Sequence, residues 1–116
     1  MKLIGSRQEQ QLRGELLRSN RALKSGLGNP GLLRVLKESS HDPEKSYVLN
    51  WIPEQGEDIY TVLVFPGNLM EIEIPRGSGS VEMRELDLRN YAEKCSRINK
   101  LKLSVALQLM ERKKAD

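Results

Sequence analysis

Few side chains in this chain could act as nucleophiles, general bases or metal ligands. His41 is the only histidine and Cys95 the only cysteine among 116 residues. Nucleophile–histidine catalysis would require a serine or Cys95 to lie beside His41 in space, and structural zinc sites use about four Cys or His ligands. The pattern around Cys95 places it on the apolar side of a helix, which favours a structural thiol. We therefore expect no catalytic site, no metal and no cofactor.

Acidic residues are concentrated in the middle of the chain. Residues 46–88 contain 2 Lys or Arg and 8 Asp or Glu, whereas residues 1–45 contain 9 and 5 and residues 89–116 contain 8 and 3. Paired carboxylates can support acid–base chemistry or bind a cation, but their spacing does not fit a calcium loop. A negative surface that attracts a basic protein partner is the favoured interpretation. Its predicted members are the carboxylates Glu54, Glu57, Asp58, Glu71 and Glu73, with Trp51 or Tyr60 as the aromatic anchor.

Basic residues of the first predicted helix offer an alternative surface. They are Arg7, Arg18, Arg21 and Lys24. Such residues can neutralise phosphates, and with His41 they would suit an RNA-binding module or a small ribonuclease. The basic segments lack the aromatic residues that stack on bases. Nucleic acid is therefore the less favoured partner.

The stretch from Trp51 to Arg76 indicates the sheet that must position the acidic residues. Strands are predicted over 47–52, 59–65 and 69–74, with a polar connection at 53–58 and a tight turn at 65–68. Strict alternation places Tyr47, Leu49 and Trp51 on one face. The second strand is apolar on both faces apart from Thr61, as central strands are. Residues 81–84 predict a short fourth strand at an edge.

Helical patterns flank these strands. A capping box at Ser6–Glu9 predicts a helix to about Ser25, with Leu12, Leu16 and Leu23 on its apolar side. A second helix is predicted from Asn29, as N-cap, to about Ser39.

A final helix is predicted to begin near Leu88. Residues 101–110 also alternate as a strand would, but Leu, Ala, Gln, Met and Lys dominate and favour helix.

Together the patterns predict an α+β protein with a three- to four-stranded antiparallel sheet, two N-terminal helices and one long C-terminal helix. We expect residues 1–116 to form a single domain. Residues 1–4 are followed at once by Gly5 and a polar run, which leaves no room for the apolar core of a signal peptide. No run of about 20 apolar residues exists for a membrane span, so we expect a cytoplasmic location.

The pattern IPEQGEDIYTVLV at 52–64, in a short charged chain, resembles small bacterial accessory proteins. The nearest such group is the immunity proteins that pair with polymorphic or contact-dependent growth-inhibition toxins. The resemblance implies a cytoplasmic inhibitor that blocks one toxin domain by protein–protein interaction, and a nuclease is the expected toxin. A self-associating accessory protein, assembling through the apolar last helix, is the other alternative. The sequence leaves the oligomeric state open.

Overall fold

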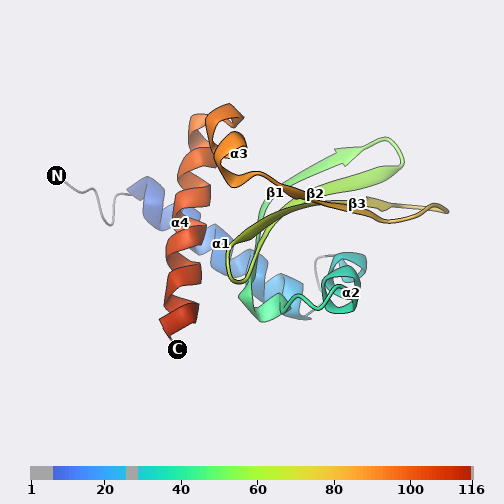
Figure 1. Cartoon of the computed structure of the whole chain (residues 1–116), viewed down its shortest axis with the longest axis horizontal. Helices are drawn as coiled ribbons and strands as arrows, with labels where there is room; N and C mark the ends of the chain where they lie inside the picture. Colours follow the sequence, from blue (N-terminus) through green and yellow to red (C-terminus); the bar gives the residue numbers. More distant parts are fainter. Residues whose placement is uncertain (1–6, 26–28, 116) are drawn as a thin grey trace.

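The computed structural model describes residues 7–25 and 29–115. Within these ranges it contains four α-helices, one 3-10 helix and four strands (Figure 1). In chain order they are α1 (Arg7–Ser25), α2 (Pro30–Glu38), η1 (Pro43–Lys45), β1 (Ser46–Glu54), β2 (Glu57–Val64), β3 (Asn68–Pro75), β4 (Glu82–Leu86), α3 (Leu88–Lys94) and α4 (Arg97–Ala115). The strands form one antiparallel sheet in the order β1-β2-β3-β4. The predicted α+β class, the central second strand and the edge position of the fourth are confirmed.

The sheet separates two apolar clusters. On one side, which we call the α2 face, Leu32 and Leu36 of α2 pack over Val62 and Ile72. The opposite side, the α4 face, carries a second cluster built with α1 and α4. Its buried members are Leu16, Tyr47, Leu49, Leu63, Leu69, Leu103, Val105, Ala106, Leu109 and Met110. Figure 1 shows α2 on one side of the sheet and α4 crossing the other end of the molecule.

Helix α1 contributes to both clusters, because it runs past the β1 edge of the sheet. Leu16 packs with the α4 cluster and Leu23 with the α2 cluster. Both leucines and Leu12 are buried, as the apolar periodicity predicts. Ser6, the predicted capping residue, lies outside the described residues.

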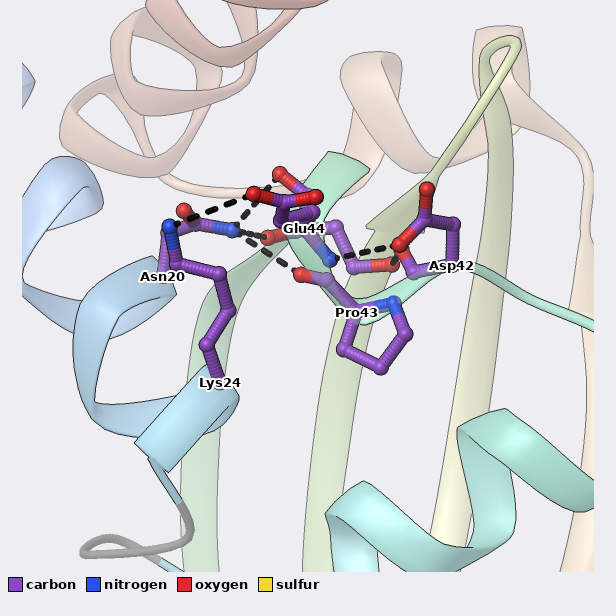
Figure 2. Close-up of polar contacts among 6 residues, drawn as sticks. Asn20, Lys24, Asp42, Pro43 and Glu44 are labelled. Carbon is purple, nitrogen blue, oxygen red and sulfur yellow. Dashed lines mark hydrogen bonds and ion pairs between the residues drawn. The ribbon is translucent and has the colours of Figure 1, made fainter.

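One buried polar residue of α1 was not predicted. The side-chain amide of Asn20 donates hydrogen bonds to the backbone carbonyls of Pro43, Glu44 and Ser46, at 3.0, 3.2 and 2.8 Å. Figure 2 shows this amide pointing into the turn that leads into β1. Asn20 is only 5% exposed, so these bonds replace solvent for its buried amide and connect it to the carbonyls at the entry to β1. They fix the helix against the start of the sheet.

Helix α2 begins as predicted. Asn29 is its N-cap, and its side-chain Oδ1 accepts from the backbone N–H groups of Gly31 and Leu32. The other end of the same amide donates to the Tyr60 hydroxyl at 2.7 Å. The cap therefore also attaches α2 to β2.

A β-bulge in β1 overturns part of the predicted alternation. Val48 pairs with Val62, yet Asn50 pairs with Thr61, so Leu49 is an extra residue in the ladder. Beyond a bulge the side chains exchange faces. Trp51 therefore lies on the α2 face, opposite to the predicted sharing of a face with Tyr47 and Leu49.

The connection between β1 and β2 is shorter than the predicted polar connection at 53–58. Strand β1 continues to Glu54 and β2 begins at Glu57, so only Gln55 and Gly56 form the turn. Gly56 has φ 87°, a backbone conformation that glycine adopts at little cost. Glu54, Glu57 and Asp58 are consequently strand residues with fixed faces.

The prediction of a single long C-terminal helix is also wrong. The helix is interrupted at Cys95 and Ser96, which separate α3 from α4. Cys95 ends α3, and the Ser96 hydroxyl accepts from the backbone N–H of Asn99 in the first turn of α4. Cys95 is half-buried and is not part of the last helix. Residues 101–110 are helical, as their composition predicts.

Candidate functional site

Half of the α4 face has no helix over it. The helices cover the sheet where Leu63 and Leu69 lie, and Figure 1 shows the β1–β2 hairpin and the far ends of β3 and β4 extending beyond α3 and α4. The uncovered half begins immediately beyond that leucine layer. No helix packs directly on its outer residues, although the row next to the leucine layer is partly covered by α3.

The first row of this open half crosses all four strands. Strand register aligns Asn50 with Thr61, Thr61 with Glu71, and Glu71 with Arg84. We call these four residues the polar row. Arg84 binds the Oε2 atom of Glu71 through Nε at 2.8 Å and through Nη2 at 2.7 Å. This pairing sets the position of the Glu71 carboxylate, whose side chain is 22% exposed.

The rows farther out are dominated by carboxylates. Register pairs Ile52 with Ile59 and Glu73 with Glu82. At the hairpin end, Glu54 pairs with Glu57. Like charges directly opposite each other destabilise a sheet, and the open half contains two such pairs.

The electrostatics of Glu73 reflect this crowding. Its pKa is raised, first by partial desolvation and then by the neighbouring charges of Glu57, Glu82 and Glu71. Raised carboxyl pKa values are expected where like charges converge. The open half is thus a region of negative potential built from residues distant in sequence.

A groove of about 350 Å³ lies between the polar row and α3. Its lining comprises Asn50, Ile52, Thr61, Glu71, Leu86, Asp87, Asn90, Tyr91, Lys94 and Cys95. Thr61 is 7% exposed, and its hydroxyl makes no side-chain hydrogen bond to any described residue. Every fully buried polar side-chain atom in the described part of the chain has a hydrogen-bond partner. The Thr61 hydroxyl has none there, so it is not fully buried, and it is reached from the groove that Thr61 lines.

The α2 face carries a different cluster, centred on Asp58. Its carboxylate accepts from the Trp51 indole N–H at 3.0 Å and binds Arg76 at 2.8 Å. These hydrogen bonds, the Arg76 one foremost, hold the pKa of Asp58 below its usual value. Trp51 stacks on its cross-strand partner Tyr60 with ring centroids 6.3 Å apart. Burial raises the pKa of Tyr60.

The predicted acidic surface is therefore divided between the two faces. By register, Glu54, Glu57, Glu71 and Glu73 share the α4 face. Asp58 lies on the α2 face and is buried in a pair with Arg76. The predicted anchors lie there too, with Trp51 56% exposed and Tyr60 buried.

The other predicted residues lie away from the open half. Arg7, Arg18, Arg21 and Lys24 are exposed on α1, and the Lys24 ammonium lies 3.9 Å from Glu44. His41 follows α2, where its backbone N–H donates to Leu36. None of the side-chain hydrogen bonds between described residues joins His41 to a serine or to Cys95.

Sequence reasoning missed Asn50, Thr61, Glu82 and Arg84 as members of the open half. Thr61 had one available signal, as the single polar residue in an apolar strand. The other three depend on the bulge and on strand register, which the sequence pattern did not specify.

Within the described residues, no three His, Cys, Asp or Glu side chains are arranged to hold a metal ion. No helix in those ranges has the length and apolar content required to cross a bilayer. Comparison with family models, curated proteins and solved structures gave no match.

Proposed function

We propose that this chain is a protein-binding inhibitor of the immunity type, which docks the open half of its α4 face on a basic toxin domain. The observation that carries the proposal is the pair of like-charge cross-strand contacts, Glu54–Glu57 and Glu73–Glu82, on an uncovered sheet. Such contacts lower the stability of the isolated protein. A cationic partner would convert this unfavourable repulsion into favourable attraction.

Apolar groups beside the carboxylates support a protein rather than a small ion as the partner. Ile52 and Val81 are each 43% exposed at this end of the sheet. Protein interfaces combine an apolar centre with a charged periphery. The acidic rows would repel nucleic acid, so a nuclease toxin, whose own surface must be basic, suits this face. Such an inhibitor would act in the cytoplasm, where the toxin's target lies.

The sheet edges are unsuited to pairing with a partner strand. Strand β1 carries a bulge and Pro53 at its outer half, and Pro53 has no N–H to donate. Strand β4 presents the charged residues Glu82, Arg84 and Glu85. Recognition is therefore expected through side chains of the open face.

The test is co-expression with the product of the neighbouring gene, as the candidate toxin domain, followed by purification of the complex. The double variant Glu73→Lys with Glu82→Lys should lose protection and weaken association, and its affinity should depend less on salt. Glu85→Lys is the matched control, because Glu85 lies on the opposite face of β4. Unchanged protection by the double variant would contradict the proposal.

Trp51 supplies a second arm of this experiment. Its exposed indole lies on the α2 face, and the sequence predicts it as an anchor. Trp51→Ala should leave association unchanged if only the open half of the α4 face docks. Loss of association in that variant alone would place the interface on the α2 face.

A further inference from the structure

We propose that the groove between the polar row and α3 takes an arginine side chain of the partner. This inference rests on the proposed function, because it assigns the chemistry by which a basic partner is recognised. Three members of the polar row, Asn50, Thr61 and Glu71, form one side of the groove. Asn90, Tyr91 and Lys94 of α3 form the other. The acidic rows lie beside its open end on the same face.

Two acceptors in the groove have unused hydrogen-bonding capacity. The Thr61 hydroxyl has no side-chain hydrogen bond to a described residue although the residue is 7% exposed. Both bonds from Arg84 end on the Oε2 atom of Glu71, and Oε1 receives none from the described residues. Both acceptors are reached from the groove, where the N–H groups of a ligand can replace the water that otherwise serves them. They therefore favour a ligand rich in N–H groups.

Arginine matches this arrangement better than lysine does. Thr61 and Glu71 are register partners on adjacent strands, and adjacent strands lie about 4.8 Å apart. A planar guanidinium carries five N–H donors and can serve two such acceptors at once. A lysine ammonium is a compact point charge without that span.

The rest of the lining suits the aliphatic part of the same side chain. Ile52 and Leu86 supply apolar surface, and Tyr91 adds an aromatic ring. Lys94 is the cation on the opposite wall, and Asp87 is an anion beside it. The excess of negative over positive charge around the groove comes from Glu73 and Glu82, which lie beyond the groove on the same face.

The experiment uses the full chain and N-acetyl-L-arginine amide as the probe, with backbone amide NMR shifts as the readout. We expect saturable shifts confined to the groove strands and α3. The lysine analogue should bind more weakly, and the uncharged citrulline analogue should not bind. Thr61→Val should weaken arginine binding by about tenfold, whereas Thr61→Ser, which keeps the hydroxyl, should restore it.

Glu85→Gln is the control, since its carboxylate lies on the α2 side of the sheet and accepts from Asn68. Thr61→Val removes one hydroxyl with little change of shape, so its spectrum reports directly whether the fold is kept. Equal binding of arginine and citrulline, or equal binding by wild type and Thr61→Val, would overturn the inference.

The same variants separate this inference from the proposed function. If Glu73→Lys with Glu82→Lys abolishes toxin protection but Thr61→Val has full affinity for the toxin and the arginine probe, the arginine site is wrong and the proposed function stands. If the probe binds and depends on Thr61 while the toxin does not bind, the groove is an arginine site and the proposed function is wrong.

Discussion

Trp51 donates its indole N–H to Asp58 at 3.0 Å across the β1–β2 pair, and Arg76 binds the same carboxylate from the end of β3. The contact joins two strands and the segment that follows the third. It holds the far end of the sheet together on the α2 face. Trp51 is also the only tryptophan, so tryptophan fluorescence reports on this site, including the stacking of Trp51 on Tyr60.

Asp58→Asn is expected to lower the free energy of unfolding at pH 7. The folded-state pKa of Asp58 is lowered by its bonds to Arg76 and Trp51, so its stabilisation is present above the unfolded pKa of about 3.9. That stabilisation is lost as pH falls through the lower folded value. Denaturation monitored by Trp51 fluorescence should show wild type and variant converging at acid pH. A difference that persists unchanged to low pH would contradict this assignment.

Glu73→Gln is expected to raise the free energy of unfolding at pH 7, the opposite of the effect expected for Asp58→Asn. The folded-state pKa of Glu73 is raised by desolvation and by Glu57, Glu82 and Glu71. Its ionised form therefore destabilises the fold above that raised pKa, and the penalty disappears as pH falls below about 4.3, the unfolded value. Denaturant titrations at low and high salt measure the effect, which salt should reduce. Glu85→Gln serves as the control from the other face, and a loss of stability in Glu73→Gln would refute the prediction.

Asn20→Ala is expected to lower the free energy of unfolding by about 2 kcal/mol, because it leaves buried carbonyls without a donor. Asn20→Asp should cost more, since a carboxylate would face the carbonyl oxygens of Pro43, Glu44 and Ser46. Arg21→Ala, at an exposed neighbouring position, should change stability by less than about 0.5 kcal/mol. Thermal and urea unfolding measure all three. Equal effects of the alanine and aspartate variants would show that the amide is not the important group.

Leu16 and Leu17 make a matched pair for the core. Leu16 is fully buried and Leu17 is 36% exposed. Leu16→Ala should cost about 3 kcal/mol through lost burial and a cavity, whereas Leu17→Ala should cost less than about 0.5 kcal/mol. Urea unfolding of both variants is the measurement. Similar costs would mean that Leu17 contacts a second copy of the chain, which sizing chromatography would then detect.

The sequence predicts those parts of the fold that depend on neighbours along the chain. The Asn29 cap, the leucine face of α1 and the central position of β2 all follow from short patterns. The helical state of residues 101–110 followed from intrinsic propensity. In each case the deciding interactions lie within a few residues.

Features that depend on contacts between distant segments could not be predicted. The extra residue at Leu49 breaks no local rule, yet it exchanges the faces of Trp51 and Asn50. The Arg76–Asp58 pair and the Glu73–Glu82 contact depend on register between strands. The break at Cys95 and Ser96 interrupts a pattern that looks continuous in apolar residues. Four predicted carboxylates share one face, but the aromatic residues predicted beside them lie on the other.

The bulge at Leu49 also makes β1 tolerant of a change in length. Because Asn50 already pairs with Thr61, deletion of Leu49 would leave Val48 and Asn50 as consecutive members of the ladder. The outer half of the strand would keep its alternation, with Trp51 on the α2 face and Ile52 on the acidic face. A single-codon deletion at the bulge would therefore leave the recognition surface in place, whereas the same deletion farther along β1 would exchange the faces of the residues beyond it.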